Sequence, residues 1–341
     1  MSNFVNKDFY IIAEIGHNHQ GSLEKAKELF NEAKKAGVDA VKLQKRDNKY
    51  LYTKNFYNSL YDNPNSYGRT YGEHREALEF DKKQYLSLID HAKKIDIDFF
   101  ATPFDFKSVD FLEELNMPFY KIASADLTNI PLQEYIAKTN KPIILSTGGG
   151  SFKDVKRAVE NILKINKNLT VLHCTAAYPA PIEDMNLAVI SKYKKEFSGL
   201  RIGLSDHENG IDAGVLAYML GARVFEKHFT LNRANKGTDH SFSLEPEGLK
   251  KFVRNIKRIE IMLGSDKKNL LESEKKPLFK MKKSIVLNKS LKAGHVLTKD
   301  DLEFKSPGGG MEPYEYTKII GKKISKDLIE ETIILPEYLV I

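Results

Sequence analysis

Two histidines in the second half of the chain, His207 and His228, have the type and position expected of a metal site. Each ends or follows a short apolar run, and neutral imidazoles are the commonest metal ligands in proteins. Two imidazoles completed by water or a carboxylate would leave an open site. Such a site suits Lewis-acid catalysis by Mn²⁺ or Mg²⁺ better than structural zinc. The alternative is a pair of hydrogen-bonded histidines without a metal.

Lysines and hydroxyl side chains stand at the ends of other apolar runs. The lysines are Lys42 and Lys121, and the hydroxyls belong to Thr102, Ser124, Ser146 and Ser205. A lysine charge surrounded by hydroxyl donors can hold a phosphate or a carboxylate, and the backbone of Gly148-Gly149-Gly150 can approach an anion closely. These residues predict a small anionic substrate. A Schiff base on Lys121 is the rival role, although it would not need the two histidines.

The elements that position these residues alternate in type along the first two-thirds of the chain. Helix-period segments separate eight short apolar runs: Tyr10–Gly16, Ala40–Gln44, Asp98–Pro103, Phe119–Ser124, Pro142–Thr147, Thr170–Thr175, Arg201–Asp206 and Arg223–Phe229. Continuously apolar runs indicate parallel strands buried on both faces. The predicted fold class is therefore α/β, a (β/α)8 TIM barrel, in which such strand ends form the active site. A doubly wound sheet is the alternative, but the segment after the first strand lacks the G-x-G-x-x-G pattern of that fold.

Two connections have informative sequences. Apolar residues of Leu23–Ala36 recur at helical spacing, and Gly37 follows as the expected C-cap. The stretch between Gln44 and Asp81 is rich in Tyr and Asn and shows little periodicity. Loops of such length inside a compact domain are usually functional, so we expect this one to cover the mouth of the barrel.

The chain changes character near its C-terminus. We expect a catalytic barrel over residues 1–266, a charged linker over 267–283, and a small module over 284–341. The module contains the β-type runs Ser284–Val286 and Ile333–Leu335. A module of this size is near the lower limit for independent folding, so we expect it to pack against a partner surface.

Composition excludes several classes of protein. The net charge of the 341 residues is +7, but the basic residues are scattered among acidic ones, which argues against nucleic acid as a partner. No apolar run reaches the length of a membrane span, and the polar N-terminus does not resemble a secretory signal. The single cysteine, Cys174, cannot form an intrachain disulfide. We therefore expect a cytoplasmic protein without nucleic-acid or membrane partners.

With these residues in place, the whole chain resembles the sialic acid (nonulosonate) synthase family. The phrases that carry the resemblance are Ile12-Ala13-Glu14-Ile15-Gly16-His17-Asn18-His19-Gln20-Gly21, Val41-Lys42-Leu43-Gln44, Ala101-Thr102-Pro103-Phe104, Tyr120-Lys121-Ile122-Ala123-Ser124, Leu145-Ser146-Thr147-Gly148, His173-Cys174-Thr175, Tyr178-Pro179, Gly203-Leu204-Ser205-Asp206-His207 and Glu226-Lys227-His228-Phe229-Thr230. The C-terminal segment is similar to that family's antifreeze-like (SAF, β-clip) domain. The phrases occur in order and on the expected strand ends.

The resemblance implies condensation of phosphoenolpyruvate with an open-chain N-acylhexosamine such as N-acetylmannosamine. The products would be a nine-carbon 3-deoxy-2-keto sugar acid and phosphate, released by metal-assisted C–O cleavage. The phosphoenolpyruvate-binding residues it implies are Lys42, Thr102, Lys121, Ser124, Ser146 and Ser205. The implied metal ligands are His207 and His228, with Mn²⁺ or Mg²⁺ as the cofactor. The implied sugar-binding residues are Gln44, Tyr178 and Asp239, and Glu14 and Asp126 would position water or transfer protons.

The resemblance also implies a domain-swapped homodimer, in which the small domain of one subunit covers the barrel of the other. Three positions depart from the family pattern. Asp126 replaces a common Glu, Ala176 replaces an amide or hydroxyl, and Ser306 replaces an arginine that reads the acyl group. The natural sugar therefore stays open, and legionaminate or pseudaminate synthesis is an alternative. A second alternative is a 3-deoxy-ulosonate synthase that uses a phosphorylated sugar, for which Arg69 and Arg75 are the nearby cations. A third is a sugar-binding barrel without turnover.

Overall fold

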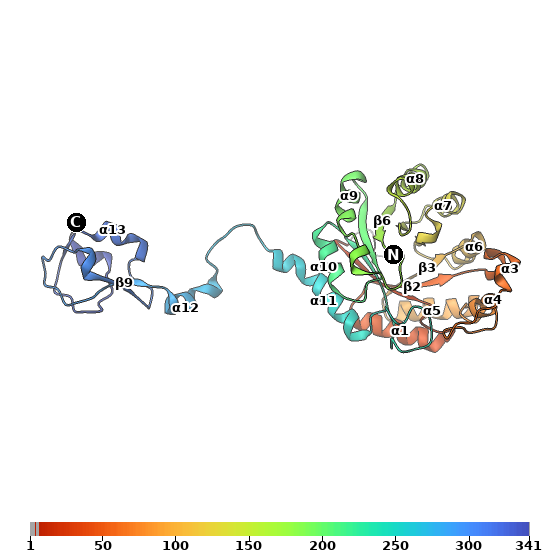
Figure 1. Ribbon diagram of the computed structural model, residues 1–341, viewed down its shortest axis with the longest axis horizontal. Coiled ribbons are helices and arrows are strands. Elements are labelled where there is room, and N and C mark those ends of the chain that lie inside the picture. The colour runs from red at the N-terminus through yellow and green to blue at the C-terminus, as the bar shows by residue number, and fades with distance from the viewer. Residues whose placement is uncertain (1–3, 5–6, 341) are drawn as a thin grey trace. The chain divides into compact units, whose positions relative to one another are not determined.

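The computed structural model describes residue 4 and residues 7–340. The chain divides into two compact units, Met1–Leu263 and Gly264–Ile341 (Figure 1). The first unit contains the whole predicted barrel, and the second contains the small C-terminal module. The expected end of the barrel at residue 266 lies a few residues beyond this division. The division does not test the expected end of the linker at residue 283. Both domain limits therefore stay predictions.

Eight parallel strands form a closed barrel in the first unit. In chain order they are β1 Tyr10–Gly16, β2 Ala40–Lys45, β3 Asp98–Pro103, β4 Tyr120–Ile122, β5 Ile143–Ser146, β6 Leu169–Cys174, β7 Arg201–Asp206 and β8 Val224–His228. Each strand pairs with its sequence neighbours, and β1 closes the barrel by pairing with β8. The predicted (β/α)8 TIM barrel is confirmed.

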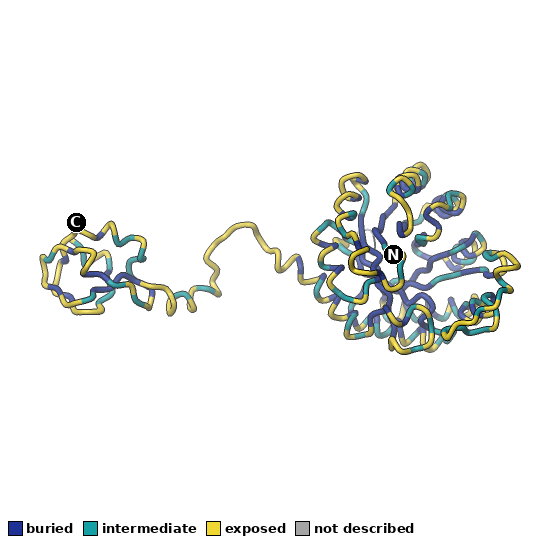
Figure 2. Tube along the Cα trace, in the orientation of Figure 1, coloured by how far each residue is buried: buried dark blue, intermediate teal, exposed yellow. Residues whose placement is uncertain are grey.

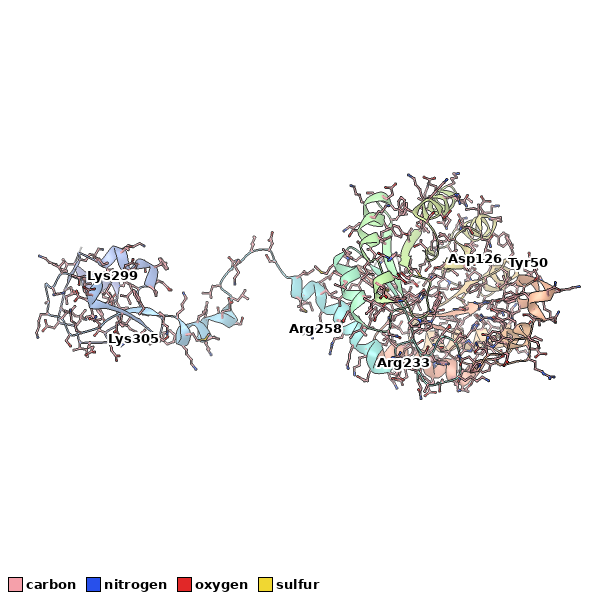
Figure 3. The ribbon with its side chains drawn as sticks, in the orientation of Figure 1. Tyr50, Asp126, Arg233, Arg258, Lys299 and Lys305 are labelled. Atoms are coloured by element: carbon pink, nitrogen blue, oxygen red, sulfur yellow. The ribbon has the colours of Figure 1, made fainter. Side chains whose placement is uncertain are left out.

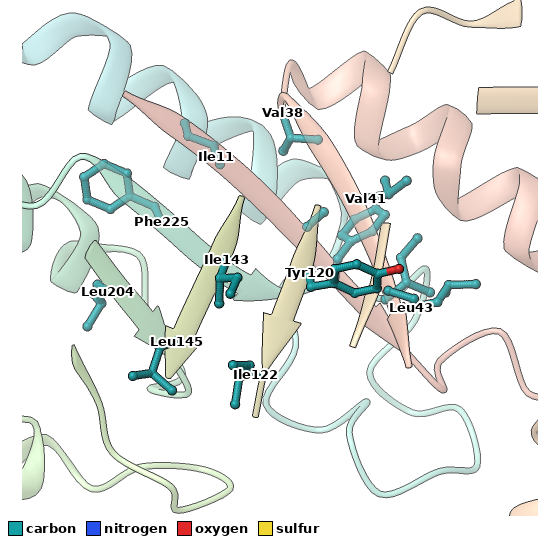
Figure 4. Packing of buried hydrophobic residues seen from close by; sticks show 14 of the residues in the cluster. Ile11, Val38, Val41, Leu43, Tyr120, Ile122, Ile143, Leu145, Leu204 and Phe225 are labelled. Atoms are coloured by element: carbon teal, nitrogen blue, oxygen red, sulfur yellow. The ribbon is translucent and has the colours of Figure 1, made fainter. Parts of the chain in front are cut away.

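Helices surround the barrel on its outside (Figure 1). They are α1 Leu23–Ala36, α5 Lys82–Lys94, α6 Phe106–Glu114, α7 Ile130–Ala137, α8 Phe152–Leu163, α9 Ala188–Glu196, α10 Asp212–Met219 and α11 Pro246–Leu263. Outward-facing strand residues such as Ile11, Val41 and Phe225 pack in the main hydrophobic cluster with the inner faces of these helices (Figure 4). Burial of this layer is the main stabilising term of the unit.

The ends of α1 show how the sequence sets an element's bounds. Ser22 is the N-cap, and its side chain accepts a hydrogen bond from the backbone N–H of Lys25. Gly37 is the C-cap with a φ of 87°, and its N–H donates to the carbonyls of Ala33 and Lys34. The left-handed backbone conformation at this position favours glycine, so the C-cap predicted from the sequence is confirmed.

The inward-facing residues of the strands change from apolar to polar along the barrel axis. A second buried cluster closes the interior near the amino ends of the strands; it contains Phe4, Tyr10, Ile12, Ala40, Phe100, Phe119, Ile144, Leu172 and Val224. Because side chains alternate along a strand, the next inward position lies two residues on, toward the mouth. Those positions include Glu14 after Ile12, Lys42 after Ala40 and Glu226 after Val224. The apolar floor therefore supports a polar layer.

The long connection after β2 is more ordered than its sequence indicates. It contains three short helices, α2 Asn48–Leu51, α3 Lys54–Tyr57 and α4 Tyr71–Glu76. Thr70 and Glu73 form a capping box at the start of α4, and Tyr57 of α3 packs against Gly72, where any side chain would collide with its ring. The connection thus has its own packing, and Arg75 of α4 lines the cavity at the barrel mouth.

The second unit has a small core of its own. It comprises α12 Glu272–Met281, β9 Ser284–Leu287, β10 Leu302–Lys305, α13 Tyr316–Ile319, β11 Lys323–Ile324 and β12 Leu339–Val340. Its buried cluster consists of Ile285, Leu287, Leu291, Leu297, Leu302, Ile319, Ile324, Leu328 and Ile334. Residues 261–270, before α12, are all exposed (Figure 2). None of the described helices is both long and apolar enough to cross a membrane.

Candidate active site

A polar cavity of about 570 Å³ lies at the mouth of the barrel, where the strands have their carboxyl ends. Active sites of TIM barrels occupy this face, and the volume is ordinary for a small-molecule site. The predicted site residues that line it are Glu14, Lys42, Gln44, Thr102, Lys121, Ser124, Ser146, Tyr178, Ser205, His207, His228 and Asp239. The structure therefore brings together all but one of the residues predicted from the sequence.

Lys42 of β2 is buried beside a carboxylate and a hydroxyl from the neighbouring strands. Its Nζ lies 2.6 Å from Glu14 Oε2 and donates a 2.7 Å hydrogen bond to Thr102 Oγ1. Gln44, two residues further along β2, donates to Glu14 Oε1 at 2.8 Å. Burial raises the pKa of Glu14, and this effect and the charge of Glu226 outweigh the opposing effect of Lys42. A buried carboxyl with a raised pKa suits proton transfer near neutral pH.

Lys121 of β4 forms a second buried pair across the cavity floor. Its Nζ lies 3.0 Å from Glu226 Oε1 on β8, and the hydroxyl of Ser205 donates to the same oxygen at 3.1 Å. Burial would raise the pKa of Glu226, but the charges of Lys121 and Lys42 lower it to about 2. This carboxylate is therefore ionised. Buried ion pairs seldom improve stability over apolar residues, so two of them at one cavity floor indicate function.

Besides Glu14 Oε2, which lies 2.6 Å from Lys42 Nζ, three buried polar atoms of the cavity have no hydrogen-bond partner within the described residues. They are Ser146 Oγ, Glu226 Oε2 and His228 Nδ1. Leaving a buried polar group unsatisfied costs about 1–3 kcal/mol, and native proteins contain few such groups. Three of them facing one cavity indicate that these atoms take their partners from a bound ligand.

The glycine turn after β5 brings the backbone close to the cavity wall. The N–H of Gly148 donates to Ser124 Oγ at 3.0 Å. A Cβ atom on Gly148 would lie 2.8 Å from Ala176 Cβ and 2.9 Å from Ser124 Oγ, so a side chain is excluded there. Ala176 occupies that space with its methyl group.

The two histidines predicted to bind a metal lie side by side. The ring centroids of His207 and His228 are 5.2 Å apart, and the ring of Tyr178 lies 4.3 Å from that of His207. Burial lowers the pKa of His207 to about 3, with a further contribution from His228. Burial likewise lowers the pKa of His228 to about 3, although Glu226 opposes this effect. Both imidazoles are therefore neutral, the form that binds metal ions.

Two of the predicted sugar-binding residues, Gln44 and Asp239, lie near the end of β1. A Cβ atom on Gly16 would lie 3.2 Å from Gln44 Nε2 and 3.5 Å from Asp239 Oδ2. Asp239 Oδ2 is also 3.9 Å from His228 Nδ1. Gln44 and Asp239 thus lie together above the Lys42 pair and beside the histidines.

Asp126 is the predicted residue that the structure places apart from the cavity. Its carboxylate accepts a 2.9 Å hydrogen bond from Asn129 Nδ2, and it does not line the cavity, although Ser124 and Leu127 do. Figure 3 labels it within the barrel unit. Burial raises the pKa of Asp126. Its hydrogen bond to Asn129 also supports the short helical turn after β4.

Glu226 and Arg46 are among the charged cavity residues that were not predicted as site residues. Glu226 stands at a strand end in the sequence, but its pairing with Lys121 joins residues 105 positions apart, which no local pattern reveals. Arg46 also lines the cavity. The alternation of side chains along a strand could have identified it, because Lys42, Gln44 and Arg46 fall on one face.

Comparisons with known proteins agree with this geometry. The NeuB family model matches residues 29–268, and the SAF domain model matches residues 282–340. N-acetylneuraminate-9-phosphate synthase of Homo sapiens is 40% identical over 329 residues, covering 96% of this chain and 92% of that protein. N,N'-diacetyllegionaminic acid synthase of Campylobacter jejuni is 38% identical over 332 residues, covering 96% and 99%.

A solved structure gives the same result in three dimensions. The N-acetylneuraminic acid (sialic acid) synthetase of Leptospira borgpetersenii, in complex with citrate, is 35% identical with a TM-score of 0.67, covering 80% of this chain and 91% of that one. The resemblance read from the sequence motifs is confirmed. The chain belongs to the NeuB family, the family of these nonulosonate synthases, and it carries the SAF domain at its C-terminus.

Proposed function

We propose that this chain condenses phosphoenolpyruvate with an open-chain N-acylhexosamine to give a nine-carbon 3-deoxy-2-keto sugar acid and phosphate. The observation that carries the proposal is the cavity floor. There two buried lysines, each beside a buried glutamate, lie among hydroxyl groups at the carboxyl ends of the barrel strands. Relatives that match this chain over 96% of its length are synthases of nonulosonic acids.

Phosphoenolpyruvate carries a carboxylate and a phosphate, and the cavity floor supplies donors for both. We assign its binding to the lysines Lys42 and Lys121 and to the hydroxyls of Thr102, Ser124, Ser146 and Ser205. Lysine is a compact point charge that binds phosphate well. The unpartnered Ser146 hydroxyl is one donor that gains a partner in this arrangement.

The donor atoms around His207 and His228 fit a divalent cation, Mn²⁺ or Mg²⁺. His207 Nδ1 donates to the Thr175 carbonyl at 2.9 Å, which leaves its Nε2 as the acceptor nitrogen, and His228 Nδ1 has no partner. No group of three His, Cys, Asp or Glu side chains within the described residues is placed to hold a metal. The remaining positions would therefore come from water and substrate, as in an open catalytic site. When bound, the cation polarises the sugar aldehyde as a Lewis acid.

The reaction joins C3 of phosphoenolpyruvate to C1 of the sugar. The aldehyde oxygen becomes a hydroxyl, water adds to C2, and the C2–O bond to phosphate breaks, which leaves the 2-keto acid. We assign to the Glu14 carboxylate the proton lost by the attacking water, because its pKa is raised and Gln44 fixes its orientation. Gln44, Tyr178 and Asp239 orient the sugar. Asp126 stays a predicted proton-transfer residue, but we assign it no step, since it lies outside the cavity lining.

We further propose that the enzyme acts as a cytoplasmic homodimer in which the SAF unit of one subunit covers the barrel mouth of the other. The small core of the second unit and the exposed segment before it support this arrangement. Covering the mouth would exclude water from a reactive intermediate.

The test is phosphate release from phosphoenolpyruvate in the presence of Mn²⁺, with and without EDTA. The sugars are N-acetylmannosamine, 2,4-diacetamido-hexoses of the legionaminate and pseudaminate types, and arabinose 5-phosphate. We expect EDTA-sensitive release with an acylated sugar. Release with arabinose 5-phosphate alone would identify a different 3-deoxy-ulosonate synthase. A folded, metal-loaded protein that releases phosphate with none of these sugars, and with none of the acylated sugars as phosphate esters, would be a sugar-binding barrel, and the proposal would be wrong.

A further inference from the structure

Two arginines line the outer part of the cavity, away from the lysines of its floor. Arg46 follows β2 and is 7% exposed, and Arg75 belongs to α4 in the long connection. The guanidinium of Arg46 stacks on the ring of Phe104, with 3.7 Å between its central carbon and the ring centroid. That of Arg75 is held by the hydroxyl of Tyr71, which accepts from its Nε at 3.0 Å.

Neither guanidinium has a carboxylate partner within the described residues. Both instead face the same imidazole: the NH1 group of Arg46 is 3.2 Å from His17 Nε2, and that of Arg75 is 3.3 Å from His17 Nδ1. Burial and the two arginine charges lower the pKa of His17 well below its ordinary value. A neutral imidazole accepts at only one nitrogen, so one of the two arginines faces an N–H group there.

The nearest candidate counter-ion of Arg46 is already engaged. Glu79 Oε2 accepts from Lys45 Nζ at 2.9 Å and from the backbone N–H of Arg46 at 3.2 Å. A guanidinium has five N–H donors. Within the described residues Arg46 uses two of them, toward His17 Nε2 and the side-chain amide oxygen of Gln44, so three of its donors are unused. A buried charge without a counter-ion is costly, which indicates that an anion belongs at this position.

The position of this anion follows from the geometry of β2. Lys42, Gln44 and Arg46 project to the same side of the strand, and successive members are separated by about 7 Å. The first lies at the phosphoenolpyruvate end and the second at the sugar. Gln44 joins them, since it donates to Glu14 at 2.8 Å and accepts from Arg46 at 2.7 Å. Arg46 therefore lies beyond the sugar, at the end away from the floor of the cavity.

We propose that the acceptor sugar carries a phosphate ester at the end remote from its aldehyde, and that Arg46 and Arg75 bind this ester. The substrate class is then an N-acylhexosamine phosphate rather than a free hexosamine. This inference rests on the proposed condensation with phosphoenolpyruvate. Two guanidinium groups with unused donors match the several acceptor oxygens of a phosphate dianion.

The experiment compares kcat/KM for N-acetylmannosamine and N-acetylmannosamine 6-phosphate at saturating phosphoenolpyruvate. We expect the wild-type enzyme to prefer the phosphorylated sugar. Arg75→Ala should reduce the ratio of the two kcat/KM values by roughly 10- to 100-fold, with Arg75→Lys in between. The KM for phosphoenolpyruvate should change little. Arg69→Ala is the matched control, because Arg69 lies on the same connection but is exposed and does not line the cavity.

Three results would overturn the inference. An equal or higher kcat/KM for the free sugar would show that the remote phosphate is not recognised, while leaving the condensation itself supported. If Arg75→Ala raises the KM for phosphoenolpyruvate and leaves the ratio of the two kcat/KM values constant, the arginines bind phosphoenolpyruvate rather than the sugar phosphate. Absence of phosphate release with either sugar would reject this inference, and the 2,4-diacetamido-hexoses of the wider panel would then decide whether the condensation itself fails. Melting temperatures of the variants exclude loss of fold as the cause.

Discussion

At the scale of single residues, the cavity floor is nearly neutral before any ligand binds. Lys42 lies beside Glu14 and Lys121 lies beside Glu226, so each positive charge has a negative partner. An incoming anion must compete with these carboxylates for the lysines. Unpaired buried lysines would be costly, and the pairing keeps them charged and in position until substrate arrives.

His228 is the residue whose replacement tests the metal assignment. We expect His228→Ala to abolish metal-dependent turnover and to leave the fold intact, because its ring lines the cavity and its Nδ1 has no partner to lose. Phosphate release across a Mn²⁺ titration, together with the circular dichroism melting curve, measures both. His91→Ala, which removes an imidazole bonded to Asn31 on the outer helices, is the control. Full activity of His228→Ala would refute the assignment.

Most of the cavity residues could be predicted because barrel topology alone sends strand ends to one mouth. Lys42, Thr102 and His207 each follow an apolar run, and each lines the cavity. The pairing of Lys121 with Glu226 could not be predicted, since it depends on which strands face each other across the barrel. Asp126 also follows an apolar run, but the turn after β4 directs its carboxylate to Asn129.

At the scale of elements, a buried ion pair fastens β7 to β8 directly beside the histidines. Lys227 Nζ lies 2.7 Å from Asp206 Oδ2, and both side chains are almost wholly buried, at 0% and 1% exposure. The same ammonium group also donates to the backbone carbonyl of Glu208. Asp206 precedes His207 and Lys227 precedes His228, so this pair sets the separation of the two strand ends.

Breaking this pair should destabilise the barrel. We expect Lys227→Met to lower the free energy of unfolding by about 3–5 kcal/mol, because it leaves the Asp206 carboxylate buried without a cationic partner. Urea unfolding followed by circular dichroism measures the change. Lys82→Met is the matched control, since Lys82 pairs with Glu114 at 2.8 Å on the surface, where ion pairs contribute little. Equal midpoints for the two variants would contradict this account.

The second unit should lose stability in acid through Asp301. Burial would raise the pKa of its carboxyl, but hydrogen bonds from Lys289, His295 and Thr298 outweigh this effect and lower the pKa well below its ordinary value. A lowered folded-state pKa contributes stability above the unfolded value of about 3.9, and that stability is lost as the pH falls below it. We expect Asp301→Asn to be less stable than the wild type at pH 7 and the difference to shrink below about pH 4.

The chain contains no tryptophan, so the fluorescence of one introduced tryptophan would report on this unit alone. Phe304→Trp would place one on β10, where the Phe304 side chain is 45% exposed and a larger ring has room. Urea midpoints at several pH values would then be compared with and without Asp301→Asn. A difference that stays constant from pH 7 to pH 3 would contradict the assignment to the Asp301 carboxylate.

Regular elements could be predicted from the sequence more readily than short ones. The expected bounds of β1, β3 and β7 and of helix α1 coincide with the observed ones. The four-residue helices α2 and α3 could not be predicted, since one turn is too short to show a hydrophobic period. They depend instead on local caps at Asp47 and Thr53.

At the scale of the whole molecule, the two units have separate cores, so each can be removed without opening the other. We expect deletion of Ser284–Ile341 to leave a folded barrel with poor turnover, because the deleted unit is proposed to cover the mouth of a partner's cavity. Melting curves and phosphate release measure the two effects. Undiminished turnover of the truncated chain would reject the covering role.

The closure of the barrel also has a consequence for synthesis on the ribosome. Glu14 of β1 stands in register with His228 of β8, so the two sides of the active site meet only through the pairing of the first strand with the last. The residues between them take on the order of 10–40 s to translate at about 5–20 residues per second. During that time β1 lacks its final partner. Metal and substrates can therefore meet a complete site only after β8 has emerged, and the nascent chain stays catalytically silent until then.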